Sequence, residues 1–269
     1  MPINDTIRIE TRGEVEVLTL NRPAALNALS TDMVSALGAY LAELPERPEI
    51  RVVLLRAEGR AFCAGLDIKE SAASGRPRDE TRVLSTWHTQ TRIANLYRMM
   101  RAAPQPFIAL AQGAACGGGF SLLLASDVRF GAPSLRMNAA YIKIGLGGCD
   151  MGASYFLPRL VGSSLASELI LTGRFINADR ALALGLLSDV VPQEKLLETG
   201  LSLADEMLQT SPYGLRMSKQ ALNLNIDAPS LEAAMAIEDR QQVILAATKD
   251  AGEAMTAFLE KRPPSYRGA

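Results

Sequence analysis

Two glycine-containing turns are the parts of this sequence best suited to chemistry. One lies within RVVLLRAEGRAFCAGLDIKE (51–70) and the other within FIALAQGAACGGGFSLLL (107–124). In each, an apolar run typical of a strand enters glycines and then the start of a helix, which leaves backbone N–H groups without partners. Three successive glycines, Gly117 to Gly119, also let another group approach the backbone closely. The turns therefore predict free backbone donors, with tight packing of helix on strand as the alternative.

Other common kinds of site are not indicated by the sequence. GAACGGG does not fit the dinucleotide pattern GxGxxG, and no GK[ST] follows it as in a Walker loop. The chain has one histidine, His88, and its three cysteines share no metal-ligand spacing, so we expect no metal site. We interpret the cysteines as free thiols in a reducing compartment.

Composition limits the class of protein. The 269 residues are 48% hydrophobic, which allows a sizeable core, and suit one large domain or one domain with a helical appendage. With 28 basic and 29 acidic residues, the chain offers no basic surface for nucleic acid. The N-terminus lacks the apolar stretch of a signal peptide, and no run approaches the roughly 18 apolar residues of a membrane helix. We therefore expect a cytoplasmic protein without a membrane or nucleic-acid partner.

Strands that alternate with helices predict an α/β fold in the first part of the chain. The segments with the alternating or fully apolar pattern of strands are 14–20, 51–56, 107–111 and 127–130. Helices are expected after Ser30, over 81–102 and over 120–125. The polar segment 71–80, with its glycine and proline, is expected to be a mobile loop.

Beyond about residue 163 the sequence predicts helices alone. The expected ranges are 163–171, 178–184, 194–208, 212–224, 230–247 and 251–260. Ser163, Asn177 and Asp250 are the expected N-caps, and Asp250 with Glu253 resembles a capping box. We accordingly divide the chain into an α/β core over 1–195 and a helical C-terminal region over 196–269.

Several segments together resemble the crotonase superfamily of enoyl-CoA hydratases and isomerases. AFCAGLDIKE (61–70) and QGAACGGGFSLLLASDVRF (112–130) carry most of the likeness. NRPAALNAL (21–29) is similar to the family's early CoA-contact loop, ELILTGRFINADRALALGLLSDVV (168–191) to its helical middle, and AFLEKRPPSYRG (257–268) to its C-terminal signature. The joint pattern is specific and covers nearly the whole chain. It implies a crotonase-like core of repeated ββα units wound as a spiral, followed by a helical C-terminal trimerisation region.

The resemblance implies an oxyanion hole made by the backbone N–H groups of Leu66 and Gly118. A thioester whose α-carbon gains or loses charge becomes enolate-like, and each preorganised donor to its oxygen is typically worth about 10²–10³ in rate. A helix that starts at Gly118 would add its dipole. The further contacts with coenzyme A or the acyl group that the resemblance implies are Arg22, Ala24, Ala64, Asp67, Ile68, Lys69, Gly117, Tyr141, Phe258 and Lys261. For Asp67 and Lys69 a solvated turn is the alternative.

The chain departs from the family at both positions where the hydratases carry glutamate. Ser121 and Tyr141 stand there instead, and tyrosine, with a reference pKa of about 10, is a poor base near neutral pH. Asp150 is the candidate replacement, because related hydrolases, dienoyl-CoA isomerases and dehalogenases place an aspartate at about this point. Apolar neighbours such as Met151 should raise its pKa. The alternative is that Asp150 caps the following helix.

The remaining candidates have simpler interpretations as structural residues. Glu168 is interpreted as structural, and Asp127 as a partner for backbone groups or an arginine. We place His88, beside Trp87, at the surface or in packing. Cys116 and Cys149 are interpreted as small core thiols.

The leading hypothesis is an enzyme that hydrates an enoyl-CoA or isomerises its double bond. A single carboxylate favours isomerisation, because a proton shuttle between carbons needs one base, whereas frequency within the family favours hydration. The alternatives are a non-catalytic acyl-CoA binding protein and an acyl-CoA hydrolase or dehalogenase that uses Asp150 as base or nucleophile. We expect the acyl-CoA thioester as the ligand, no separate cofactor because coenzyme A belongs to the substrate, and a homotrimer or a hexamer of paired trimers.

Overall fold

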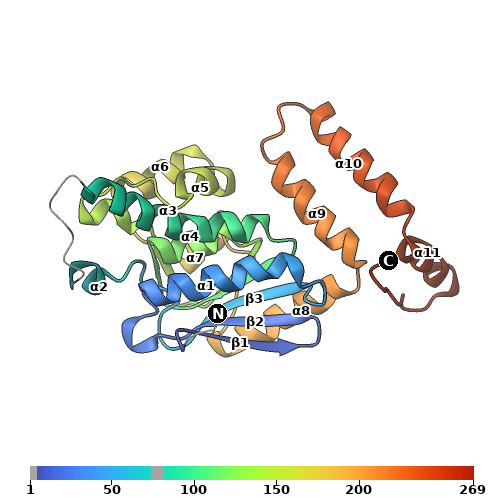
Figure 1. The fold of residues 1–269 in the computed structure, drawn as a ribbon, viewed down its shortest axis with the longest axis horizontal. Helices are drawn as coiled ribbons and strands as arrows, with labels where there is room; N and C mark the ends of the chain where they lie inside the picture. The colour runs from blue at the N-terminus through green and yellow to red at the C-terminus, as the bar shows by residue number, and fades with distance from the viewer. Residues whose placement is uncertain (1–4, 74–80) are drawn as a thin grey trace.

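The computed structural model describes residues 5–73 and 81–269. The strands in this part of the chain are β1 (Ile7–Arg12), β2 (Val15–Leu20), β3 (Val52–Ala57), β4 (Phe107–Ala111), β5 (Ala114–Cys116), β6 (Val128–Gly131), β7 (Arg136–Asn138), β8 (Ile176–Asn177) and β9 (Asp189–Val190). The α-helices are α1 (Thr31–Glu43), α2 (Ile68–Ala73), α3 (Thr81–Ala102), α4 (Gly118–Ala125), α5 (Ala153–Val161), α6 (Ser163–Thr172), α7 (Ala178–Ala183), α8 (Leu196–Leu208), α9 (Pro212–Asn225), α10 (Leu231–Ala246) and α11 (Lys249–Glu260). Figure 1 shows their arrangement.

A six-stranded sheet forms the centre of the fold, with the strand order β1-β2-β3-β4-β6-β9. β1 pairs antiparallel with β2, and the other pairings in this sheet are parallel. The apolar run VVLLRA of β3 is buried between β2 and β4, as expected for a parallel strand covered on both faces. A smaller sheet, β5-β7-β8, lies beside it. The mixed α/β class that the sequence predicts is confirmed.

Two helical layers cover the larger sheet because neighbouring residues of each strand face opposite sides. Leu55 of β3 belongs to the larger core cluster, together with Met33 of α1 and residues of α3 and α4. Leu54, next to it in sequence, faces the other way and packs in a second cluster with Leu196 of α8. Burial of these apolar side chains on both faces stabilises the sheet that carries the two glycine turns.

Strand register brings the two glycine turns to the same edge of the sheet. β3 and β4 are parallel neighbours, with Val53 opposite Phe107 and Leu55 opposite Ala109. The chain that leaves β3 at Ala57 and the chain that leaves β4 at Ala111 therefore emerge side by side. In open α/β sheets this carboxyl edge of the strands is where ligands bind.

The structure corrects several expectations about the middle and end of the chain. Strands do not stop near residue 163, since β8 and β9 add short pairings to the two sheets. Asn177 caps α7 as predicted, but Gly162 occupies the N-cap of α6 and Thr248 that of α11. Asp250 instead accepts hydrogen bonds from the backbone N–H groups of Arg267 and Gly268. Of the loop expected over 71–80, residues 71–73 end α2 and the remainder lies outside the described residues.

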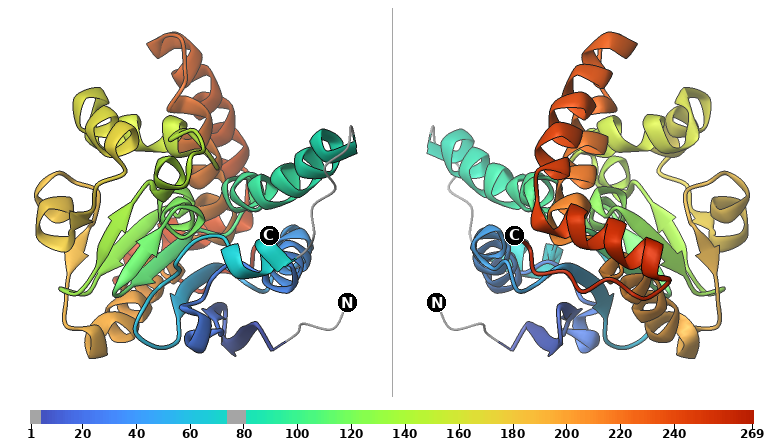
Figure 2. Two further views of the ribbon diagram at one scale, coloured as in Figure 1. Left: turned by 90° about the vertical axis from the view of Figure 1, so that its left-hand side faces the viewer. Right: turned by 90° about the vertical axis from the view of Figure 1, so that its right-hand side faces the viewer.

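The last three helices stand to one side of the molecule, away from α2, α5 and α6 (Figure 1). The buried Lys219 of α9 ties them to the core, because its Nζ lies 2.9 Å from Asp127 and donates to the carbonyls of Met100 and Gln105. Much of their apolar surface is exposed, including Leu222, Val243 and Phe258. α3 packs against α1 near Leu96, and its N-terminal end extends outward (Figure 2).

Candidate active site

The two glycine turns are joined by backbone hydrogen bonds. Cys63 donates its N–H to the Ala114 carbonyl at 3.1 Å, and its own carbonyl accepts from the N–H of Cys116 at 2.9 Å. Gly65 comes so close to the second turn that a Cβ on it would lie 2.7 Å from the Cys116 oxygen and 3.6 Å from the Gly118 nitrogen. Its φ of +91° is also one that favours glycine. The sequence alone predicted both turns, and the sheet places them in contact.

Leu66 and Gly118 each present a backbone N–H that donates no hydrogen bond within the described part of the chain. The bridge between Leu29 and Leu66 uses the Gly65 carbonyl and the Asp67 N–H, and so leaves the N–H of Leu66 unused. Gly118 is the first residue of α4, where N–H groups have no partner within the helix. Free N–H donors of this kind are chemically suited to a polarised carbonyl oxygen.

Gly118 and Gly119 of the second turn differ in why a side chain is disfavoured there. A Cβ on Gly119 would lie 2.2 Å from the Cys63 oxygen, so this glycine is required for close backbone packing. A Cβ on Gly118 would meet only side-chain ends, Leu29 Cδ1 at 2.7 Å and the Tyr97 hydroxyl at 3.0 Å. Both interpretations of the glycine run therefore hold, packing at Gly119 and free donors at Gly118.

Asp150 lies in the loop before α5, half-buried and held by two donors. Its Oδ1 accepts from the Met151 N–H at 2.7 Å and from Nε2 of Gln90 at 2.5 Å. Partial burial raises the pKa of its carboxyl, and these two hydrogen bonds lower the pKa by less. The direction agrees with the prediction from sequence. The alternative of an N-cap is wrong, because Gly152 holds that position and no side chain caps α5.

A cavity of about 550 Å³ opens beside Asp150. One wall is α3, which contributes Gln90, Ala94 and Tyr97, and the opposite wall includes Met151 and Phe156. Tyr97 donates a hydrogen bond to the Gly118 carbonyl at 3.0 Å and lies 3.2 Å from the Met151 sulfur. Tyr97 therefore links the wall of this cavity to the start of α4.

Gln90 and Tyr97 were not predicted from the sequence as site residues. Both lie on α3 and are seven residues apart, which places them on one face of the helix. That spacing was the available signal, but it does not reveal that this face meets Asp150, which lies 60 residues after Gln90.

The two positions at which the resemblance led us to expect glutamate hold a buried hydroxyl pair. Ser121 Oγ and the Tyr141 hydroxyl are 2.5 Å apart. Burial raises the pKa of Tyr141 well above its ordinary value, more than its hydrogen bond to Ser121 lowers it. Tyr141 therefore stays protonated and cannot act as a base near neutral pH. Its ring lies beside Gly117, whose Cβ would be 3.4 Å from Cε1.

The residues expected to meet coenzyme A gather at the first turn. Arg22 donates to Asp67 Oδ2 from both guanidinium nitrogens at 3.0 Å and to the Ala28 carbonyl at 2.6 Å. The hydrogen bond that the Glu70 N–H donates to Asp67 Oδ1 lowers the pKa of Asp67 most. The ion pair with Arg22 lowers it further. Ala64 bonds the Leu26 carbonyl through its N–H at 3.0 Å. Ala24 lies in the short helix Pro23–Ala25 of the same segment, and Ile68 and Lys69, both exposed, start α2.

Phe258 and Lys261 lie apart from the other candidates within one copy of the chain. They are at the end of α11, which Figure 1 shows on the side of the molecule opposite α2. Both side chains are exposed. A contact with coenzyme A by these two residues would therefore have to involve a second copy.

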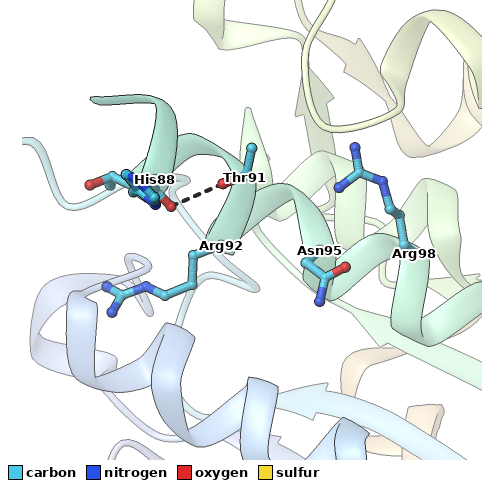
Figure 3. A pocket seen from close by; sticks show the side chains of 6 residues that line it. His88, Thr91, Arg92, Asn95 and Arg98 are labelled. Carbon is cyan, nitrogen blue, oxygen red and sulfur yellow. Dashed lines mark hydrogen bonds between the residues drawn. The ribbon is translucent and has the colours of Figure 1, made fainter. Parts of the chain in front are cut away.

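His88 faces a different hollow, of about 580 Å³, on the exposed side of α3. Figure 3 shows His88 and Arg92 projecting to one side of the helix and Arg98 to the other. His88 is exposed and does not line the cavity that contains Asp150, whereas the neighbouring Trp87 does. The expected surface role of His88 is confirmed.

The remaining candidates have structural partners. Asp127 accepts from the Phe107 N–H at 2.8 Å and pairs with Arg101 and Lys219. Glu168 pairs with Arg174 and Arg180, as its structural interpretation predicts. The placement of the thiols was wrong in part, because Cys116 is half-buried and Cys149 is exposed rather than in the core.

Clusters of potential metal ligands and membrane-spanning helices are both absent from residues 5–73 and 81–269. No group of three or more histidine, cysteine, aspartate or glutamate side chains is close enough there to hold a metal ion. No helix of these residues combines the length and apolar character needed to span a membrane.

Comparison with known proteins assigns this arrangement to a family. The family model described as enoyl-CoA hydratase/isomerase matches residues 10–269. The chain belongs to the enoyl-CoA hydratase/isomerase family. It is 36% identical over 267 residues to the 2,3-dehydroadipyl-CoA hydratase of Escherichia coli, covering 97% of this chain and 98% of that protein. It is 32% identical to the short-chain-enoyl-CoA hydratase of Clostridium acetobutylicum, covering 97% of each.

Solved structures of this family agree with the fold. A crystal structure of an enoyl-CoA hydratase from Bacillus anthracis matches with a TM-score of 0.91 and 34% identity, over 98% of this chain and 100% of that one. The crotonase fold that the sequence motifs implied is thereby confirmed for this member of the enoyl-CoA hydratase/isomerase family, and so is an enzyme of the hydratase/isomerase type.

Proposed function

We propose that this enzyme holds an acyl-CoA thioester oxygen between the N–H groups of Leu66 and Gly118 and moves protons with Asp150. The observation that carries the proposal is the placement of one half-buried carboxylate of raised pKa beside the cavity. Oδ1 of Asp150 already accepts two hydrogen bonds, whereas Oδ2 accepts none from the described residues. Oδ2 is therefore the atom assigned to proton transfer.

Double-bond isomerisation is the reaction that this geometry favours. Asp150 Oδ2 removes a proton from C2 of a 3-enoyl-CoA, and the electron pair of that C–H bond moves into the thioester. Negative charge develops on the thioester oxygen, where the two N–H donors stabilise it. The carboxylic acid then returns the proton to C4, and the double bond moves from C3–C4 to C2–C3. One carboxylate completes the cycle, and no second acid or base is needed.

Hydration is the second candidate, and the names of the relatives favour it. Adding water across C2–C3 needs a base for the water and an acid for C2. Ser121 and Tyr141 occupy the positions of the two glutamates of the hydratases, and their hydroxyl groups are hydrogen-bonded to each other. Asp150 would then have to serve in both steps, taking a proton from water and giving it to C2.

A panel of thioesters with identified products tests the proposal. Purified enzyme is incubated with saturated, 2-enoyl, 3-enoyl, dienoyl and aryl thioesters of coenzyme A. Formation of 2-enoyl-CoA from 3-enoyl-CoA is expected, without release of free coenzyme A. Dominant formation of 3-hydroxyacyl-CoA would establish hydration instead. Release of coenzyme A, or a covalent ester on Asp150, would contradict both and favour a hydrolase or dehalogenase.

Assembly as a homotrimer, or as a hexamer of paired trimers, is part of the same proposal. The exposed apolar side chains of α9, α10 and α11 support it, since a monomer rarely leaves so many uncovered. In a trimer, Phe258 and Lys261 could reach coenzyme A in a neighbouring copy. Light scattering that shows a stable monomer at micromolar concentration would contradict the assembly. Truncation before Ala257 is expected to weaken CoA affinity, and unchanged affinity would exclude the contact.

Coenzyme A as part of the substrate, with no further cofactor, and a cytoplasmic location complete the proposal. Cys63, Cys116 and Cys149 are all free thiols, which fits a reducing compartment. Enzyme assayed after exhaustive dialysis against a chelator is expected to keep its activity.

A further inference from the structure

The cavity beside Asp150 ends in two arginines of α3. Arg98 and Arg101 line the same cavity as Asp150, and so do Gln90, Ala94 and Tyr97 of this helix. Residues three and four apart share a face of a helix, so these side chains form one continuous wall. Gln90 anchors one end of the wall to Asp150. Apolar side chains also line this cavity, among them Ala94, Met151 and Phe156.

Positive charge at this end of the cavity exceeds the negative charge available to pair with it. Arg98 forms no hydrogen bond or ion pair with any described residue. Arg101 lies 3.4 Å from Asp127, but the same carboxylate also pairs with the buried Lys219 at 2.9 Å. Asp227, which accepts a hydrogen bond from the lining residue Tyr155, is already paired with Arg159. With Asp150 counted, three carboxylates stand against four cations among these described residues. One cation is therefore left over, and it is Arg98, an exposed side chain that also lines the hollow beside His88.

The spacing along α3 separates Arg98 from Gln90, the residue that is hydrogen-bonded to Asp150. Arg98 follows Gln90 by eight residues, which is about 12 Å along the helix axis. Long side chains on a helix lean toward its N-terminus, so the Arg98 guanidinium can reach back toward Asp150. Figure 3 shows Arg98 and Arg92 projecting in different directions, and Arg92 does not line this cavity.

We infer that the acyl group of the substrate carries a carboxylate at its far end, and that Arg98, with Arg101, binds it. This inference rests on the proposed function for the position of the thioester. A guanidinium matches a carboxylate with two parallel hydrogen bonds, and the apolar side chains that line the cavity receive the methylene groups. The carboxylate would supply the negative charge that this end of the cavity lacks.

Binding of unreactive saturated thioesters tests the inference without relying on catalysis. Calorimetry compares hexanoyl-CoA with adipoyl-CoA, and octanoyl-CoA with suberoyl-CoA, so that each pair differs in its distal group. Wild-type enzyme should bind the carboxylate-ended member of at least one pair about tenfold more tightly, because a charge-assisted hydrogen bond is worth that much or more. The preference should decrease as salt is added.

Variants assign the preference to the arginine. Arg98→Gln should remove the preference and leave binding of hexanoyl-CoA unchanged. Arg92→Gln, on the same helix but outside the cavity, should keep the preference. Equal affinities in both pairs for the wild type would overturn the inference, as would an Arg98→Gln variant that keeps the preference. If Arg98→Gln weakens both members of a pair equally, the arginine binds a phosphate of coenzyme A and the inference is wrong. Absence of turnover on any thioester would overturn the proposed function alone.

Discussion

Nε2 of Gln90 lies 2.5 Å from Oδ1 of Asp150, so a residue of α3 orients the one carboxylate beside the cavity. The Met151 N–H donates to the same oxygen. Asp150 is thereby fixed through Oδ1, and Oδ2 is left for the substrate. In the proposed reaction, the orientation of the carboxylate that transfers the proton thus depends on a hydrogen bond between two segments that are distant in sequence.

Loss of the Gln90 hydrogen bond should shift the pH dependence of turnover. A donor to the carboxylate lowers the pKa of Asp150, so Gln90→Leu should raise that pKa further above 3.8. The base acts in its ionised form, and activity is lost as pH falls through this pKa. The acidic limb of kcat/KM should therefore move to higher pH. Asn95→Leu on the same helix, outside this cavity, should leave the limb in place. An unmoved limb in Gln90→Leu would show that Gln90 only supports structure.

Removal of the Gly118 N–H should reduce turnover without unfolding the enzyme. Gly118 is the first residue of α4, a position that tolerates proline. Gly118→Pro removes the donor but also adds side-chain atoms near Leu29. Gly118→Ala adds a Cβ and keeps the N–H, so it is the matched control. We expect Gly118→Pro to be about 10²–10³ slower than Gly118→Ala, with both folded by circular dichroism. Equal rates of the two folded variants would exclude the N–H as a donor.

Because the two turns are in contact at Gly65, replacing Gly65 by alanine should destabilise the enzyme far more than replacing Gly147 does. Gly65 has a φ of +91°, and its Cβ would lie 2.7 Å from the Cys116 oxygen. A left-handed conformation alone costs a residue with a Cβ about 1–2 kcal/mol, so Gly65→Ala should destabilise by more than that. A Cβ on Gly147 meets nothing within 4 Å, and Gly147→Ala should stay within about 0.5 kcal/mol. Urea unfolding measures both, and equal stabilities would contradict the contact.

Substitutions of Ser121 and Tyr141 should have coupled effects on the free energy of unfolding. They should leave the pH dependence of turnover unchanged. Ser121→Ala or Tyr141→Phe leaves one buried hydroxyl unpaired, at a cost of about 1–3 kcal/mol each. The double variant should cost clearly less than the two single costs combined, because neither hydroxyl remains. The acidic limb of kcat/KM for the double variant should match that of the wild type, because neither hydroxyl loses its proton near neutral pH. If the Tyr141→Phe variant lacked the acidic limb of kcat/KM, Tyr141 would take part in proton transfer.

The sequence predicted the elements that long patterns encode. The apolar runs of β3 and β4 and the helix over 81–102 were located correctly because several residues repeat the same pattern. β5, β7, β8 and β9 contain two or three residues each, too few for a pattern, and were missed. The six-residue β1 and the nine-residue α5 were missed as well. The cap of α11 was misplaced because Thr248 and Asp250 are both suitable capping residues. Asp250 is used elsewhere, by the returning C-terminal segment.

The candidate site was predictable in part for the same reason. Glycine turns are visible in sequence, and the resemblance to the crotonase superfamily indicated Leu66 and Gly118 as the donors within them. The partner of Asp150 could not, because no local pattern reveals that Gln90 faces it across the cavity. The pairing of Ser121 with Tyr141 also depends on tertiary structure, since Tyr141 follows β7 and Ser121 lies within α4.

Turnover of the Asp150→Asn variant tests the central claim most directly. Asparagine keeps the shape of the side chain and its Oδ1 acceptor for Gln90 and Met151, but cannot accept the substrate proton. Conversion of 3-enoyl-CoA is followed by product identification, and affinity for a saturated acyl-CoA is measured in parallel. The account predicts a loss of about 10²–10⁴ in kcat with affinity nearly unchanged. Full turnover by a folded Asp150→Asn variant would contradict it.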